Sequence, residues 1–239
     1  MPASIASVTT PAPGQEGRPH RPVRSFVLRQ GRISDAQERA LTTLLPRHGL
    51  AFQAAPLDFV ATFKRNAPVI LEIGFGMGEA SAAIAQAHPD QDFIGIEVHA
   101  PGVGALLLQI DAMALQNVRV IRHDAVEVIA QMVPENSLAG IHVYFPDPWP
   151  KKRHHKRRLL QPAFVAALAR RLTPGGYLHV ATDWEEYAEQ VVATAAAQPL
   201  LVNSAERFAP RPQWRPQTKF EARGMRLGHG VWDVLFRRR

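Results

Sequence analysis

Five short apolar segments between residues 69 and 181 alternate with stretches of helical length, and this alternation constrains the fold more than any other feature of the chain. The segments, rich in Val and Ile, are 69–73, 93–97, 118–121, 141–145 and 177–181. Helices are predicted between and after them at 79–87, 106–115, 126–132, 159–172 and 185–197. Apolar strands that alternate with helices form parallel sheets covered on both faces. The sequence therefore predicts an α/β fold with a doubly wound, mostly parallel sheet.

The two ends of the chain differ from this central pattern. Residues 1–24 contain five prolines and no apolar periodicity, which is typical of a disordered tail. Residues 25–66 are expected to form an N-terminal extension with short helices, the first of them capped by Ser34. Residues 67–239 are expected to form the α/β domain, with 231–236 as its last strand.

The chain has no cysteine among its 239 residues, which excludes disulfides, zinc ribbons, iron–sulfur clusters and thiol catalysis. This composition fits a cytoplasmic protein. No apolar run approaches the ~20 residues of a membrane span, so no membrane association is expected.

The formal net charge of +7 is distributed unevenly. Residues 70–147 contain ten acidic and two basic side chains, a net charge of −8, so the rest of the chain carries +15. An acidic centre flanked by basic arms indicates a polyanionic partner that the flanks hold. The alternative is a solvated basic surface without a partner.

A glycine-rich loop follows the first apolar segment. Gly74, Gly76 and Gly78 lie between two carboxylates, Glu72 and Glu79. Glycines let the backbone turn tightly and approach a ligand at a helix N-terminus. A dinucleotide pyrophosphate favours the spacing G-x-G-x-x-G without acids, whereas carboxylates suit a ligand with cationic groups such as S-adenosylmethionine. The alternative is a plain tight turn between strand and helix.

Three successive predicted strands end at or beside an acid, namely Glu72, Glu97 and Asp124. Ligands of open parallel sheets bind at the carboxyl ends of the strands. A carboxylate in the position of Glu97 can accept hydrogen bonds from both ribose hydroxyls, and Asp124 falls near an adenine amino group. These acids strengthen the prediction of S-adenosylmethionine as cofactor.

The fourth predicted strand ends in the sequence Phe-Pro-Asp-Pro-Trp-Pro at 145–150, which predicts a stiff loop able to hold a planar base beside the cofactor. The alternative is a proline turn with a structural Trp149. Residues 151–158 follow, with six Lys or Arg and two His. Such a run favours phosphates as counterions. Its adjacent His154 and His155 lack further ligands at metal spacing, so no metal is expected.

Five segments of the chain closely resemble the tRNA (guanine-N7-)-methyltransferases of the TrmB family. They are 25–32, 71–78, 95–97, 147–158 and 218–221, and the resemblance covers about residues 25–239 in the family's order. It implies a class I S-adenosylmethionine-dependent methyltransferase sheet with an antiparallel last strand. It also implies methylation of guanine N7 in the variable loop of tRNA (guanosine 46), and a basic RNA-contacting segment within residues 25–66.

The resemblance further implies roles for individual residues. In addition to the glycines of the loop, four carboxylates are expected to contact the cofactor: Glu72, Glu97, Asp124 and Asp147. Substrate contacts are implied for Lys151, Asp183, Thr218, Lys219, Phe220 and Glu221. RNA contacts are implied for Arg153, His154, His155, Lys156, Arg157 and Arg158. The expected partner is tRNA, and the oligomeric state is left open between monomer and homodimer.

Guanine N7 has a free lone pair, so it can attack a methyl group without first losing a proton. Asp147 is therefore interpreted as a catalytic residue that orients the base rather than as an obligatory proton acceptor. Either Asp183 or Glu221 is expected to accept the N–H groups of the guanine pairing edge. Trp149 and Phe220 have two alternatives each, stacking on the base or packing inside the protein.

Three other functions stay open on the residues alone. One is a dinucleotide-dependent oxidoreductase, which Glu79 disfavours. The second is a methyltransferase that acts on another RNA or on protein. The third is a tRNA-binding protein without catalysis, which would need no cofactor pocket.

Overall fold

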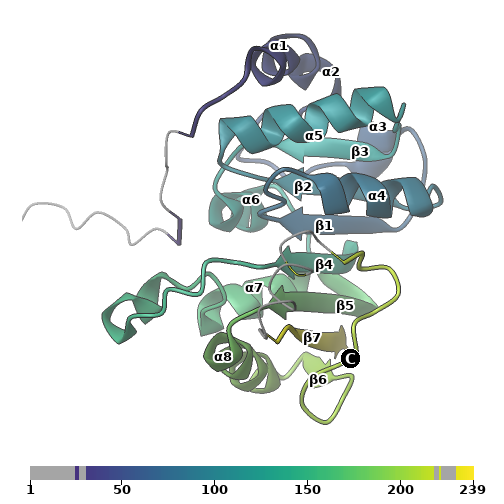
Figure 1. Ribbon diagram of the computed structural model, residues 1–239. Helices are drawn as coiled ribbons and strands as arrows, with labels where there is room; N and C mark the ends of the chain where they lie inside the picture. Colours follow the sequence, from purple (N-terminus) through teal and green to yellow (C-terminus); the bar gives the residue numbers. More distant parts are fainter. Residues whose placement is uncertain (1–24, 27–30, 218–220, 222–229) are drawn as a thin grey trace, which may run out of the picture.

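The computed structural model of the chain describes residues 25–26, 31–217, 221 and 230–239. In this part of the chain, seven strands form one sheet with the order β3-β2-β1-β4-β5-β7-β6 (Figure 1). The strands are β1 (Val69–Ile73), β2 (Asp92–Ile96), β3 (Val118–Ile121), β4 (Leu138–Tyr144), β5 (Leu172–Thr182), β6 (Leu201–Asn203) and β7 (Trp232–Arg238). Strands β1 to β5 pair in parallel, and β7 pairs antiparallel with β5 and with β6. The predicted doubly wound sheet with an antiparallel last strand is confirmed.

Helices cover both faces of the sheet. They are α1 (Asp35–Thr43), α2 (Leu45–His48), α3 (Phe59–Phe63), α4 (Glu79–Ala87), α5 (Ala100–Ala112), α6 (Ala125–Gln131), α7 (Pro162–Arg171) and α8 (Glu185–Ala196). Successive residues of a strand point to opposite faces. Ile70 accordingly packs with α1, α4 and α5, whereas Leu71 packs with α6, α7 and α8. Every residue of β1 is buried, which explains why all of them except Glu72 are apolar.

The N-terminal extension packs onto the sheet domain through α1 and α5 (Figure 1). Ser34 caps α1 as predicted, and its hydroxyl accepts a hydrogen bond from the N–H of Gln37. A Cβ atom on Gly104 would lie 2.7 Å from the carbonyl oxygen of Gln37, so this close approach requires glycine. Residues 1–24 lie outside the described residues.

Helix α5 begins at Ala100, six residues before the predicted start at Leu106. The glycines at 102 and 104 are poor helix formers, and they obscured its first turns. A Cβ atom on Gly102 would lie 2.2 Å from the carbonyl oxygen of Gly76. The start of α5 can therefore lie directly against the glycine loop only because residue 102 has no side chain.

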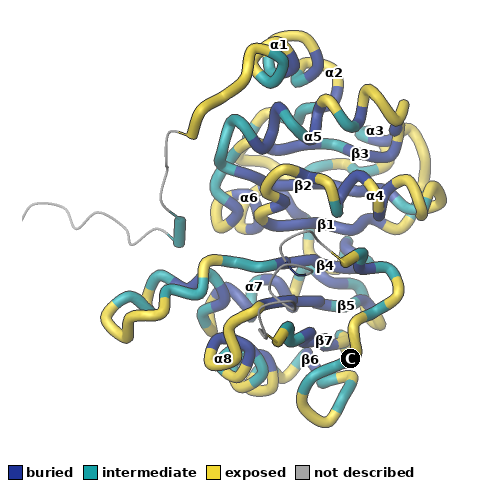
Figure 2. The backbone as a smooth tube through the Cα atoms, viewed as in Figure 1, coloured by how far each residue is buried: buried dark blue, intermediate teal, exposed yellow. Residues whose placement is uncertain are grey.

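The structure differs from the sequence prediction at two further places. Pro174, Gly175 and Gly176 predict a loop, but β5 begins at Leu172 and runs through them, with a shift of register against β4. Strand β6 was not predicted, because three residues at a sheet edge give too short a pattern. A 3₁₀ helix, η1 (Lys152–Arg157), projects from the loop after β4, where much of its surface is exposed (Figure 2).

Candidate active site

Two adjoining cavities lie at the carboxyl edge of the parallel strands. The first, of about 220 Å³, is lined by Gly74, Glu97, Asp124 and Asp147 among others. The second, of about 430 Å³, is lined among others by Glu72, Gly76, Gly78, Tyr144 and Asp183. Gly74, Phe145 and Pro146 line both cavities. The strand-end acids that are far apart in the sequence are thus gathered around one continuous site.

The glycine loop has the backbone that its sequence predicts. Gly74, Gly76 and Gly78 all have positive φ angles, of 76°, 57° and 77°. A Cβ atom on Gly78 would also lie 2.7 Å from the Cβ of Leu106. The backbone conformation therefore favours glycine at all three positions, and packing on α5 requires it in addition at Gly78.

The Glu97 carboxylate follows β2 and is held by backbone donors. Its Oε1 accepts hydrogen bonds from the N–H groups of Val98 and His99 at 2.7 and 3.0 Å, and its Oε2 accepts one from Gly76 at 3.1 Å. A carboxylate has about four acceptor positions, so one stays available to a ligand hydroxyl. The oxygens are thus fixed in direction on the wall of the first cavity, as binding a ribose requires.

Glu72 lies inside the second cavity and is almost fully buried. Burial, with a smaller contribution from the charge of Glu97 and against the opposing effect of the Ser81 hydroxyl, raises the pKa of Glu72 to about 7. A cation placed beside this carboxyl group favours its ionised form and is itself stabilised. The site therefore fits a ligand that carries a positive charge next to the glycine loop.

Asp124 caps α6, since its Oδ1 accepts a hydrogen bond from the N–H of Val126 at 2.9 Å. It also lines the first cavity beside His123, whose ring stacks on Phe52 of the extension with centroids 3.8 Å apart. Sequence reasoning missed His123, Tyr144 and Phe145 as lining residues. All three lie at the ends of parallel strands, and that position was the signal that could have found them.

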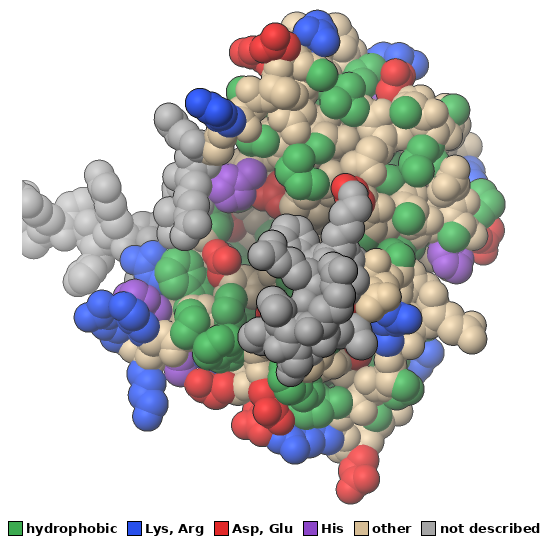
Figure 3. All heavy atoms as spheres, viewed as in Figure 1, with side chains coloured by type: hydrophobic (Ala, Val, Ile, Leu, Met, Phe, Trp, Pro, Cys, Tyr) green, Lys and Arg blue, Asp and Glu red, His purple; other side chains and the backbone are tan. Residues whose placement is uncertain are grey.

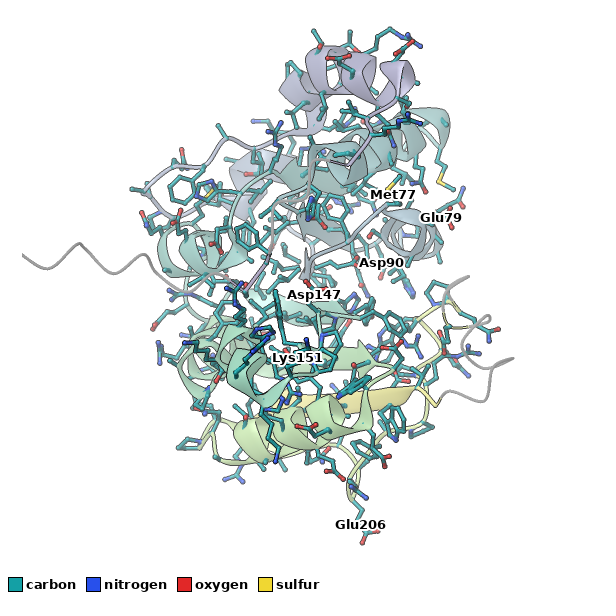
Figure 4. The ribbon with its side chains drawn as sticks, turned by 60° about the vertical axis from the view of Figure 1, so that its left-hand side comes forward. Met77, Glu79, Asp90, Asp147, Lys151 and Glu206 are labelled. Carbon is teal, nitrogen blue, oxygen red and sulfur yellow. The ribbon has the colours of Figure 1, made fainter. Side chains whose placement is uncertain are left out.

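The loop after β4 is stiffened by its prolines and contains two residues with strained backbone conformations. Phe145 and Trp149 have φ angles of 50° and 44°, although each directly precedes a proline, where extended conformations are favoured. Such conformations cost about 1–3 kcal/mol each and persist where the surroundings impose them. Asp147 lies between them, exposed at the mouth of the first cavity. Lys151 follows on the same loop and is also exposed (Figure 4).

Trp149 is held within the protein. Its indole Nε1 donates a hydrogen bond to the carbonyl oxygen of Ser25 at 3.2 Å, and the guanidinium of Arg157 lies 5.1 Å from its ring centroid. The His154 ring meets it edge-on at 5.8 Å. Of the two alternatives for Trp149, these contacts fit internal packing, and they fasten the start of the extension to the loop.

Arg158 differs from the prediction that the whole basic run faces RNA. The residue is 2% exposed, and its Nε donates to the carbonyl oxygen of Pro148 at 2.8 Å. Its other nitrogens bond to Gln190 and His155, and its guanidinium lies 5.0 Å from the Tyr187 ring centroid. Arg158 thus ties the proline loop to α8, and an RNA contact does not fit this buried position.

The other basic side chains of the run are more accessible. Lys151, Arg153 and Lys156 are exposed, and His154, His155 and Arg157 are half-buried. Lys, Arg and His side chains gather on this projecting loop in the space-filling view (Figure 3).

Asp183 and Glu221, the two acids expected to read the guanine edge, have different surroundings. Asp183 is exposed and lines the second cavity. Glu221 is buried, and its oxygens accept hydrogen bonds from the guanidinium of Arg215 at 2.6 and 3.0 Å. Thr218, Lys219 and Phe220 lie outside the described residues. The geometry therefore favours Asp183 for contact with a base in the cavity.

The described part of the chain contains no group of three or more His, Asp and Glu side chains arranged to hold a metal ion. None of its helices combines the length and apolar character needed to cross a membrane.

Known proteins share this fold and much of this sequence. A family described as a putative methyltransferase matches residues 66–234. The chain is 62% identical over 229 residues to the tRNA (guanine-N(7)-)-methyltransferase of Ralstonia nicotianae, covering 95% of this chain and 91% of that protein. It is 59% identical over 238 residues to the protein of the same name from Aromatoleum aromaticum, covering 99% of this chain and 92% of that protein.

Solved structures agree at the level of the fold. The 16S rRNA methyltransferase KamB superposes with a TM-score of 0.56 at 15% identity, over 75% of this chain and 92% of that one. An aminoglycoside resistance methyltransferase, NpmB1, superposes with a TM-score of 0.53 at 16% identity, over 76% of this chain and 92% of that one. The sheet order, the acid-lined cavities at its carboxyl edge and the near-complete match to curated relatives lead to one assignment. The chain belongs to the tRNA (guanine-N7-)-methyltransferase family and has the class I methyltransferase fold.

Proposed function

We propose that this protein methylates N7 of a guanine in the variable loop of tRNA, with S-adenosylmethionine as the methyl donor. The observation that carries the proposal is the pair of adjoining cavities that meet at Phe145 and Pro146. One cavity presents the acids suited to an adenosine, and the other presents Asp183 to a base. The names of the highly similar relatives support the same reaction.

The residues present fit the cofactor. Glu97 has a free acceptor position for a ribose hydroxyl, and Asp124 lies in the same cavity for the adenine end. Glu72 lies in the adjoining cavity beside the glycine loop, where its carboxylate would face the cationic groups of the methionine part. When bound, S-adenosylmethionine supplies an electrophilic methyl group.

The chain's own residues would then align the guanine base with the methyl group and stabilise the charge that develops on the base. Guanine N7 needs no deprotonation, so catalysis depends mainly on holding the base in line with the methyl group. Asp183 would accept the N1–H and N2–H groups of the guanine pairing edge, which fixes the orientation of the ring. Positive charge develops on the ring as N7 forms its new bond, and the carboxylates of Asp147 and Asp183 stabilise that charge.

The exposed basic side chains beside the site would bind the tRNA backbone. Lys151, Arg153 and Lys156 lie next to the cavities on the loop and η1, and phosphate contacts position a nucleic acid without reading its sequence. The N-terminal extension would add to this surface. The target guanine must leave its stack to reach Asp183, at a cost of a few kcal/mol. We place this reaction in the cytoplasm, with tRNA as the partner.

The test is transfer of labelled methyl groups to unmodified bulk tRNA, followed by digestion to nucleosides. We expect the label in N7-methylguanosine. Asp183→Asn should lower the rate about ten- to a hundredfold, the effect of one lost hydrogen-bonded charge, with cofactor affinity unchanged. Asp90→Asn, an exposed acid in a turn away from the cavities, is the matched control and should keep the parental rate.

Three results would contradict the proposal. Label in another nucleoside of RNA would assign a different methylation. Label in protein would change the substrate class. Cofactor and tRNA binding without any transfer would support the alternative of a binding protein.

A further inference from the structure

A buried polar network that the proposed reaction does not use lies next to the second cavity. It joins β4, β5, β7 and the segment before Glu221, through Tyr144, His179, Trp214, Arg215, Glu221 and Asp233. His179 is fully buried, and Arg215 and Asp233 are 2% and 4% exposed. Tyr144 of this set lines the second cavity.

The hydrogen bonds define the state of His179. Its Nδ1 accepts from the indole Nε1 of Trp214 at 3.3 Å and lies 3.1 Å from the hydroxyl of Tyr144. Because an indole N–H is only a donor, Nδ1 carries no proton. The proton of the neutral ring is therefore on Nε2, which donates to Oδ1 of Asp233 at 2.7 Å. Burial lowers the pKa of His179, in agreement with a neutral ring.

Arg215 connects this network to Glu221. Its Nε and one terminal nitrogen donate to the two oxygens of Asp233 at 2.8 and 2.9 Å. Its terminal nitrogens also donate to the two oxygens of Glu221 at 2.6 and 3.0 Å. One planar guanidinium thus bridges two carboxylates, a geometry that an ammonium group cannot reproduce.

The bridge runs from the sheet to the wall of the cavity. Asp233 is fixed in β7, opposite Ala181 of β5, and the carbonyl oxygen of Ala181 accepts the N–H of Phe145. The guanidinium of Arg215 lies 5.8 Å from the ring centroid of Phe145. Phe145 lines both cavities and begins the loop that carries Asp147. Arg215 therefore contacts the residue at the junction of the two cavities.

Stability alone is a weak explanation for such a network. Replacing a buried ion network by apolar side chains is often neutral or stabilising, and the best-attested use of buried charges is to fix one arrangement among several. Here the arrangement fixed is that of Glu221, in a segment resembling the family's substrate-contacting one, and of Phe145. Both oxygens of Glu221 accept hydrogen bonds from Arg215, so the direction of this carboxylate is set by the guanidinium.

We propose that Arg215, held by Asp233 and His179, is a positioning residue for the guanine side of the site, which acts through its contacts with Glu221 and Phe145. This inference rests on the proposed function. It predicts that loss of the Arg215–Glu221 pair slows methyl transfer to tRNA and leaves cofactor binding intact.

The test compares Arg215→Lys, Glu221→Gln and the double variant in the full-length protein. Each single variant should lower kcat/KM for tRNA about ten- to a hundredfold, as expected for a small misplacement of reacting groups. The affinity for S-adenosylmethionine should stay within about twofold of the parent, because Glu72, Glu97 and Asp124, the acids proposed to hold the cofactor, take no part in the Arg215–Glu221 pair. The double variant should be no slower than the slower single variant, because both changes break one pair.

Arg207→Gln is the matched control. Arg207 precedes Arg215 by eight residues and also pairs with a carboxylate, Glu189, but both side chains are exposed. This variant should keep the parental kcat and KM. If Arg215→Lys does not fold, Asp233→Asn takes its place in the comparison, because it loosens Arg215 and leaves Glu221 unchanged.

The outcomes separate the two proposals. A parent that does not methylate tRNA would contradict the proposed function. An active parent with folded variants at the parental rate would overturn only the positioning role. If the double variant loses kcat/KM by the product of the two single losses, Glu221 acts on the tRNA independently of Arg215, which would overturn the positioning role. Parallel loss of cofactor binding, melting temperature and activity would show that the network only stabilises the fold.

Discussion

The carboxylate of Glu97 accepts a hydrogen bond from the backbone N–H of Gly76 at 3.1 Å, which joins the end of β2 to the glycine loop that follows β1. The contact couples the two elements expected to hold opposite parts of the cofactor. Glu97 therefore braces the loop, and in the proposed reaction it would also bind the ribose.

Replacing Glu97 tests both effects. Glu97→Ala should weaken binding of S-adenosylmethionine by about 1–3 kcal/mol, the effect of leaving buried polar groups unpaired. Isothermal titration calorimetry measures the affinity, and circular dichroism should remain native. Glu206→Ala, an exposed acid far from Asp147, is the control (Figure 4). An unchanged affinity in Glu97→Ala would show that Glu97 does not bind the ribose.

The raised pKa of Glu72 predicts a specific dependence of stability on pH. The folded state holds this proton more tightly than the unfolded state, in which the pKa is near the ordinary value of 4.5. The stabilisation is therefore complete below about pH 4.5 and is lost as pH rises through about 7. We expect the free energy of unfolding to fall by up to about 3 kcal/mol across this range because of Glu72.

Urea unfolding between about pH 5 and pH 8 measures this effect in the ligand-free protein. Glu72→Gln should flatten the pH dependence, because the amide does not titrate. Glu206→Gln, which changes an exposed acid, should leave it as in the parent. Equal pH slopes in the parent and in Glu72→Gln would contradict the assignment of the raised pKa to this residue.

Substitutions of Asp147 distinguish orientation from proton transfer. Asn keeps the size of the side chain and one acceptor oxygen, so Asp147→Asn should slow the reaction by at most about 4 kcal/mol in activation free energy without abolishing it. Asp147→Ala should be slower, because the positioning contact is gone. Single-turnover rates at saturating cofactor and tRNA make the comparison. Equal inactivity of the two variants, with both ligands still bound, would contradict the orienting role.

The basic run should divide into two kinds of residue. Arg153→Gln and Lys156→Gln remove exposed charges, and each lost phosphate contact should reduce the log–log salt slope of tRNA binding by about one. Arg158→Gln removes buried bonds to Pro148 and Gln190 and should instead lower the melting temperature, with a salt slope close to the parent's. A reduced salt slope of tRNA binding in Arg158→Gln would contradict this division. So would a parental salt slope in Arg153→Gln and Lys156→Gln.

These predictions depend on features of which the sequence reveals only some. The positions of Glu72, Glu97 and Asp124 could be predicted, because acids at the ends of parallel strands must meet at one edge of a sheet. The burial of Arg158 could not, since a run of like charges does not indicate which side chain turns inward. The bond between His179 and Asp233 joins residues 54 positions apart, and no local pattern predicts such a contact.

Local sequence patterns also gave wrong predictions where tertiary packing overrides the backbone preferences of single residues. The glycines at 102 and 104 argue against a helix, yet close contacts with Gly76 and Gln37 require them within α5. Phe145 precedes a proline and would be expected to be extended, yet its φ is 50° at the junction of the two cavities. Such departures from local rules are expected where a structure serves binding or catalysis.

The most direct test of guanine N7 as the methyl acceptor uses a tRNA transcript in which 7-deazaguanosine replaces guanosine. The replacement removes the N7 atom and its lone pair but keeps the pairing edge that Asp183 would bind. We expect this transcript to bind with near-parental affinity and to compete with ordinary tRNA, but to receive no methyl group. Methyl transfer to the 7-deaza transcript at the rate of the ordinary transcript would contradict the assignment of guanine N7 as the acceptor.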